Sequence, residues 1–127
     1  MDQNLLFLIG RIIFGGYFIM NAFNHFSKAE MMSQYAQSKN VPSPKIAIYL
    51  TGLLLLLGGT GVLLWIYPEI ALFLLLLFLI PVSFKMHAFW SITDMQPKMI
   101  EMINFTKNMA LVGAILMLYK LTPFLTL

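Results

Sequence analysis

Polar side chains gather near one end of three otherwise apolar segments, and their spacing is that of a helix face. Residues four apart lie on the same side of a helix, one turn above each other. Three pairs have this spacing: Asn21 with His25, Ser83 with His87, and Asn104 with Asn108. Polar groups within apolar helices usually face a bundle interior or a water-filled cavity, so the pattern favours a shared pocket.

The histidines and an asparagine are the candidates for chemistry in this pocket. We expect a floor of His25, His87 and Asn108, a mouth with Lys107 and Asp94, and Asn21 and Trp90 beside them. An imidazole there could ligate a haem, donate to a quinone carbonyl, or make a structural hydrogen bond. Haem ligation is the weakest of these hypotheses, because both histidines lie near helix ends and a haem bound there would protrude into the membrane interface. The simpler alternative is that these polar residues only cap helix ends where they meet water.

Arg11 also lies inside an apolar run, about one helix length from His25 and on a similar helix face. A guanidinium in hydrocarbon is costly unless it finds a partner or reaches the headgroups. Glu69 should lie on the same side of the membrane and is the candidate partner; simple extension to the outer headgroups is the alternative. We therefore include Arg11 among the candidate ligand-binding residues.

The composition places these residues in a membrane protein. Hydrophobic residues make up 60% of the 127 and charged residues only 10%, against roughly 45–50% and 25% in soluble domains. The net charge of +3 comes from scattered basic residues and is not a nucleic-acid signal. The chain has no cysteine, which excludes thiol exchange, cysteine-ligated iron–sulfur clusters and cysteine–zinc sites. Ten methionines without a clustered motif do not favour copper.

Four apolar stretches predict an all-α integral membrane four-helix bundle in a single domain, residues 1–127. A spanning helix needs roughly 20 apolar residues, and we expect spans at about 4–25, 45–66, 69–90 and 103–122. A short interfacial amphipathic helix over residues 27–38 should separate the first two spans, begun by a Ser27–Glu30 capping box. Ser43 should cap the next helix, with Pro44 in its first turn.

Lysine placement predicts the orientation. The connector between the first two spans carries Lys28, Lys39 and Lys45, and the connector between the last two carries Lys85, Lys98 and Lys107. By the positive-inside rule both connectors should be cytoplasmic and both termini outside. The absence of a basic segment before the first apolar run favours a retained helix over a cleaved signal peptide.

Several short segments of the chain resemble a known family. They are Gly10, Arg11 and Ile12 with Gly15 and Phe18, residues 40–44, Gly58 and Gly59, residues 87–90 with Asp94, and residues 105–113. In their order and spacing they resemble the DoxX family of small four-helix membrane proteins over nearly the whole chain. Members often carry a Glu before the glycine pair, where this chain has leucine throughout 53–57, so an Arg–Glu pair between the first two spans is not available.

The resemblance implies a multi-pass protein of the bacterial or archaeal cytoplasmic (inner) membrane. Some relatives serve as small subunits of quinone-linked oxidoreductases, so we expect a non-catalytic membrane subunit with a quinone or lipid pocket near His87. It would have no covalently bound cofactor and no nucleic-acid partner; its partners would be the bilayer and a redox enzyme subunit. The alternatives are a small-molecule or lipid binding or transport protein without a redox role, and a membrane scaffold for a soluble partner.

Overall fold

The computed structural model describes residues 2–125, and in that range the regular elements are helices. Four helices are long and apolar enough to span a membrane, with a shorter helix after the first and two single 3₁₀ turns. In chain order the elements are α1 (Gln3–Ser27), α2 (Ala29–Ser38), α3 (Pro44–Leu64), α4 (Pro68–Met86), η1 (Phe89–Ser91), α5 (Met95–Leu121) and η2 (Thr122–Phe124). The expected all-α membrane architecture is confirmed.

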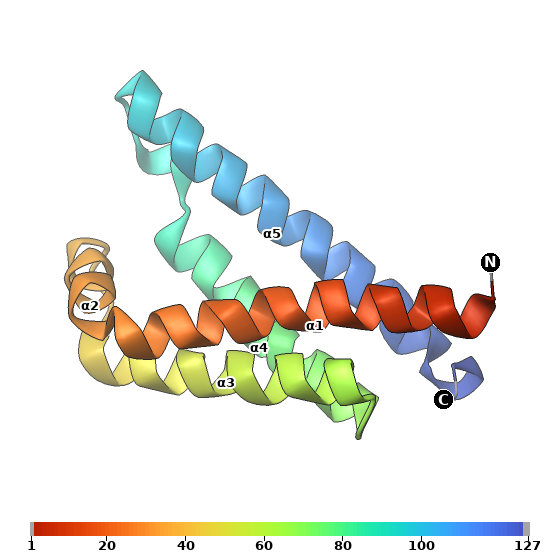
Figure 1. Ribbon diagram of the computed structural model, residues 1–127. Coiled ribbons are helices and arrows are strands. Elements are labelled where there is room, and N and C mark those ends of the chain that lie inside the picture. The colour runs from red at the N-terminus through yellow and green to blue at the C-terminus, as the bar shows by residue number, and fades with distance from the viewer. Residues whose placement is uncertain (1, 126–127) are drawn as a thin grey trace.

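The four long helices pack in sequence, α1 on α3, α3 on α4 and α4 on α5. The two ends of the chain lie at one end of the molecule, and α2 and the α4–α5 connection lie at the other (Figure 1). Toward the α2 end, α5 leans away from α1, so the bundle is splayed there (Figure 1). That splayed end is where the sequence places its polar pairs.

Glycines set the close packing of α1 against α3. A Cβ on Gly15 would lie 2.7 Å from the carbonyl oxygen of Gly59, and a Cβ on Gly59 would lie 2.9 Å from that of Gly15. Backbone atoms cannot move aside as a flexible side chain can. Small residues therefore let α1 and α3 approach closely at Gly15 and Gly59.

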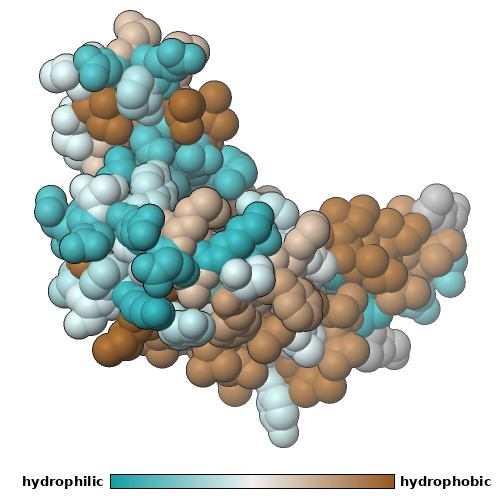
Figure 2. All heavy atoms as spheres, turned by 60° about the vertical axis from the view of Figure 1, so that its left-hand side comes forward, coloured by the Kyte–Doolittle hydropathy of each residue, from teal (hydrophilic) through white to brown (hydrophobic). Residues whose placement is uncertain are grey.

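The buried core is a strip of large apolar side chains contributed by all four long helices. It includes Phe18, Leu55, Val62, Leu72, Leu75, Leu79 and Ile115. Many other Leu, Ile and Phe side chains remain exposed on the helix surfaces, as expected where the surrounding solvent is lipid. In the view that brings the α2 end forward, hydrophilic residues gather at that end and apolar residues dominate the part of the surface away from it (Figure 2).

Two helix boundaries differ from those expected. The third long helix ends at Met86 rather than near residue 90, because the chain leaves helical geometry at His87 (φ −117°, ψ 36°) and enters η1. The fourth begins at Met95, not near residue 103. Asp94 occupies its N-cap position, and Pro97 falls in the first turn, where a helix does not need its N–H.

Two predicted side-chain caps are wrong. The Ser27 hydroxyl donates to the carbonyl of Phe23, one turn back in α1, and α2 starts after Lys28 without a side-chain cap. Ser43 is at the N-cap of α3 but has φ 45° and makes no capping bond. Pro44 does occupy the first turn, as expected. In both places the backbone geometry of the connection, and not the serine, decides where the helix starts.

Candidate functional site

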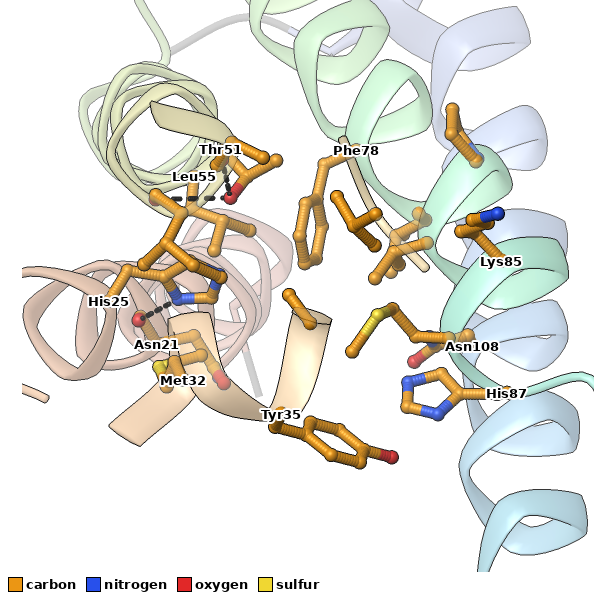
Figure 3. Close-up of a pocket in the computed structure, with 18 of the residues that line it drawn as sticks. Asn21, His25, Met32, Tyr35, Thr51, Leu55, Phe78, Lys85, His87 and Asn108 are labelled. Carbon is orange, nitrogen blue, oxygen red and sulfur yellow. Dashed lines mark hydrogen bonds between the residues drawn. The ribbon is translucent and has the colours of Figure 1, made fainter. Parts of the chain in front are cut away.

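A cavity of about 340 Å³ opens at the splayed end of the bundle. One wall comes from α1 and α3, the opposite wall from α4 and α5, and α2 closes one side (Figure 3). Its surface is mainly aliphatic and aromatic, with a few polar side chains on the walls. Those polar side chains are Asn21, His25, Tyr35, Thr51, Lys85, His87, Lys107 and Asn108, besides Tyr17.

His25 is held on the α1 wall. Its side chain is buried, and its Nδ1 lies 2.8 Å from the carbonyl oxygen of Asn21. The ring meets Phe78 edge-on across the cavity, with centroids 5.8 Å apart. Behind it, a Cβ on Gly52 would lie 2.9 Å from the His25 Cβ, so α3 backs the residue closely. The other ring nitrogen faces the cavity (Figure 3).

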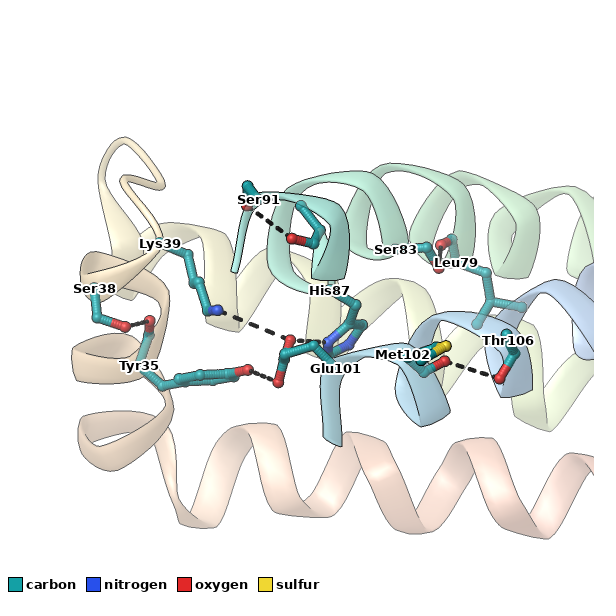
Figure 4. A network of polar contacts seen from close by, with 11 residues as sticks. Tyr35, Ser38, Lys39, Leu79, Ser83, His87, Ser91, Glu101, Met102 and Thr106 are labelled. Atoms are coloured by element: carbon teal, nitrogen blue, oxygen red, sulfur yellow. Dashed lines mark hydrogen bonds and ion pairs between the residues drawn. The ribbon is translucent and has the colours of Figure 1, made fainter. Parts of the chain in front are cut away.

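His87 sits on the opposite wall, at the end of α4. Its Nδ1 lies 2.8 Å from Oε2 of Glu101 on α5. The Tyr35 hydroxyl on α2 donates to Oε1 of the same carboxylate at 2.7 Å, and the Lys39 ammonium lies 3.9 Å from Oε2 (Figure 4). Glu101 is only 6% exposed, so this buried carboxylate is compensated by three partners.

The Glu101 network links α2 to the packed pair of α4 and α5. Tyr35 and Lys39 are one turn apart on the α2 segment, His87 ends α4, and Glu101 belongs to α5. Burial, followed by the hydrogen bond and the negative charge of Glu101, raises the pKa of the Tyr35 phenol. Tyr35 therefore stays protonated and remains a donor over the physiological range.

Five of the eight residues predicted for the site line this one cavity: Asn21, His25, His87, Lys107 and Asn108. Lys85, next to the predicted helix end, joins them. Asp94 does not, because it is exposed at the start of α5. Trp90 is half-exposed in η1 and packs edge-on against Phe105, with ring centroids 5.4 Å apart, outside the cavity lining.

Arg11 lies at the other end of the bundle and is not part of the cavity. Its Nη1 donates to the carbonyl oxygen of Leu63 at 2.9 Å, and its guanidinium lies over the ring of Phe7. The expected pairing with Glu69 does not form. The Glu69 carboxylate instead accepts from the hydroxyl of Thr122 at 3.0 Å. The positive φ of Trp65 ends α3 so that its last carbonyls are available to Arg11.

Glu101, Tyr35 and Lys39 are the site residues that sequence reasoning missed. The hydrogen-bond partner of His87 is Glu101, which was not among the candidate residues. One signal was present: a lone acidic residue next to an apolar span, which needs a partner when buried. Within residues 2–125 no group of three or more His, Asp or Glu side chains could hold a metal ion.

Comparison with protein families gives a match over the part of the chain that contains both cavity histidines. The DoxX family model matches residues 6–88, from the first turn of α1 through the end of α4. The chain belongs to the DoxX family. In this DoxX protein the match includes both histidines but stops before α5, so Glu101, Lys107 and Asn108 lie outside it. No curated protein and no solved structure matches the chain. With its four apolar helices, family membership supports a multi-pass membrane protein.

Proposed function

We propose that this DoxX protein is a non-catalytic membrane subunit of a quinone-linked redox system and holds a quinone in the cavity between His25 and His87. The observation that carries the proposal is the pair of histidines on opposite walls of an apolar cavity, each with one ring nitrogen turned inward (Figure 3). A quinone is a flat apolar ring with an oxygen on each of two opposite sides. Imidazoles on opposite walls could each meet one of these two oxygens, whether it is a carbonyl or, in the reduced form, a hydroxyl.

The size and lining of the cavity suit such a ligand. Small-molecule sites are typically apolar clefts of roughly 300–1,000 Å³ with a few placed polar groups, and this cavity of about 340 Å³ falls at the lower end. Phe78 and Leu55 offer an apolar and aromatic surface to a ring. Because the bundle is splayed, a long apolar tail could extend from the cavity into lipid.

The proposal includes an orientation and a partner. The cavity lies at the end that carries the basic connectors, which we place on the cytoplasmic side of the inner membrane. Lys28, Lys45 and Lys98 belong to those connectors and would face a soluble or peripheral redox subunit. The membrane protein would then present a lipid-soluble carrier to that partner without performing the electron transfer itself.

A second function is favoured by the exposed lysines at the cavity. Lys85 and Lys107 line it and are themselves exposed, with the Lys107 ammonium 5.9 Å from the centre of the Tyr17 ring. Two ammonium groups above an apolar cleft would also suit a lipid with an anionic headgroup. Such a protein would bind or transport lipid and need no redox partner.

Native mass spectrometry and solvent extraction of protein purified in mild detergent test the proposal. We expect a co-purifying quinone, lost in Ala47→Phe, which fills the cavity wall, and retained in Ala110→Phe, an exposed position outside the cavity. A retained anionic lipid with no quinone would favour the second function. A quinone retained equally by both variants would place it outside the cavity and contradict the proposal.

A further inference from the structure

The hydrogen bonds of the two cavity histidines fix which ring nitrogen carries the proton. At His25 the Nδ1 partner is the backbone carbonyl of Asn21, which can only accept. At His87 the Nδ1 partner is the Glu101 carboxylate, whose other oxygen already accepts from Tyr35. The nearby Lys39 ammonium favours the charged carboxylate, which again can only accept. Both Nδ1 atoms must therefore carry hydrogen.

In its neutral form an imidazole has one donor and one acceptor nitrogen, so with hydrogen on Nδ1 the Nε2 atoms of neutral His25 and neutral His87 are acceptors. Both rings turn their free edge to the cavity (Figure 3). Among residues 2–125, no side chain or carbonyl is hydrogen-bonded to either Nε2 atom. The cavity thus offers two lone pairs from opposite walls.

Three uncharged donors that line the cavity are already committed elsewhere, whereas the Tyr17 hydroxyl and the Asn108 amide are not hydrogen-bonded within residues 2–125. The Thr51 hydroxyl donates to the carbonyl of Ala47 at 2.7 Å. The Asn21 amide donates to the carbonyl of Tyr17 at 2.8 Å, and the Tyr35 hydroxyl donates to Glu101. A ligand that brings only acceptors, such as a carbonyl compound, meets a lone pair at each of the two histidines. A ligand that brings hydroxyl donors finds two acceptors.

We propose that the cavity selects the reduced, dihydroxy form of its ligand, a hydroquinone, over the quinone. This inference rests on the proposed function and specifies the redox form that the site retains. The two ligand hydroxyls donate to Nε2 of His25 and of His87. Glu101 is a positioning residue in this scheme, because it acts on the ligand only by holding the proton on Nδ1 of His87.

Binding of tetramethylhydroquinone and of tetramethylbenzoquinone to the purified protein, without oxygen at pH 8, tests the preference. We expect the hydroquinone to bind about tenfold more tightly, the effect of roughly one well-made hydrogen bond. In Glu101→Gln the new amide can donate to Nδ1 of His87, which permits the other tautomer, so the preference should shrink or reverse. Glu30→Gln, at an exposed carboxylate paired only with Lys45, should keep it.

Equal or tighter binding of the quinone by the parent protein would overturn this inference and leave the proposed function standing. If neither form binds, the proposed function fails with it. Glu101→Gln removes a buried charge, which can prevent folding. ¹⁵N NMR of histidine-labelled parent protein therefore gives a test without a variant, and it is simple to read because the chain has two histidines. We expect both rings protonated at Nδ1; protonation at Nε2 in both would also overturn the inference.

Discussion

At the scale of single residues, the Glu101 carboxylate holds two polar residues of the cavity lining, Tyr35 and His87. Its oxygens lie 2.7 Å from the Tyr35 hydroxyl and 2.8 Å from Nδ1 of His87. When a buried charged group loses one hydrogen-bond partner, the free energy lost usually exceeds the net stability that the bond contributed. The reason is that the group is left unsatisfied away from water. The network should therefore be sensitive to very small changes in its side chains.

Tyr35→Phe removes one hydroxyl from this network and leaves the ring. We expect the free energy of unfolding in detergent micelles to fall by about 0.5–1.5 kcal/mol, as for one hydrogen bond on a partly exposed residue. Tyr49→Phe is the matched control, since Tyr49 is similarly exposed and its ring stacks on Phe26 without a recorded hydroxyl bond. Equal losses in the two variants would show that the bond to Glu101 contributes nothing.

The raised pKa of Tyr35 predicts how the difference in stability between the parent protein and Tyr35→Phe depends on pH. Because the folded state holds this proton more tightly than the unfolded state, the resulting stability is complete below the usual tyrosine pKa of about 10. It is lost as the pH rises through the raised value. The stability difference between parent and Tyr35→Phe should stay constant from pH 7 to about 9.5 and shrink above pH 10. A difference that grew in alkali would have the wrong sign.

At the scale of helices, the contact between α1 and α3 determines whether one wall of the cavity exists. Gly15 and Gly59 bring the two backbones together, and Gly52 sets α3 behind His25. Alanine normally favours a helix over glycine by about 1 kcal/mol. Where the neighbouring helix leaves no room for the alanine Cβ, the steric clash outweighs this gain in helix propensity.

Gly15→Ala and Gly16→Ala give a matched test at adjacent positions. A Cβ at Gly15 would meet the Gly59 carbonyl at 2.7 Å, whereas a Cβ at Gly16 would meet nothing within 4 Å. We expect Gly15→Ala to lower the free energy of unfolding by about 1–3 kcal/mol and Gly16→Ala to leave it unchanged or raise it. Thermal unfolding followed by circular dichroism measures both, and equal effects would mean that α1 and α3 are not in close contact.

The helices themselves were predictable from sequence, because long apolar runs identify spanning segments wherever they pack. The start of α5 was not, and that error hid Glu101. A helix expected to begin near residue 103 leaves residue 101 at a solvated end, where a carboxylate needs no partner. With the start at Met95, Glu101 lies almost two turns inside the helix. The helical spacing of Asn21 and His25, together with the position of His87, predicted that these residues face one pocket. No local sequence pattern links Tyr35 to Glu101, which are 66 residues apart.

At the scale of the whole molecule, the polar end and the two chain ends lie at opposite ends of the bundle (Figure 1). We place the polar end in the cytoplasm because the connectors there carry most of the lysines. The orientation decides from which side a soluble partner could reach the cavity.

Single cysteines in this cysteine-free chain test the orientation. Ser38→Cys, at the exposed end of α2, should resist a membrane-impermeant thiol reagent in whole cells and react after permeabilisation. Gln3→Cys, exposed at the opposite end, should react in whole cells. The reverse pattern would turn the molecule over in the membrane and put the cavity outside.

Photo-crosslinking with an azido-quinone, followed by peptide mapping, tests the central claim most directly. If the cavity holds the quinone, adducts should gather on lining residues such as Phe78, Ile48 and Met86, and excess unlabelled quinone should suppress them. Exposed residues outside the cavity, such as Phe73 and Met117, should react weakly and without competition. Adducts spread over those outer surfaces, unchanged by competitor, would show that the quinone only dissolves around the protein and would contradict a binding role for the cavity.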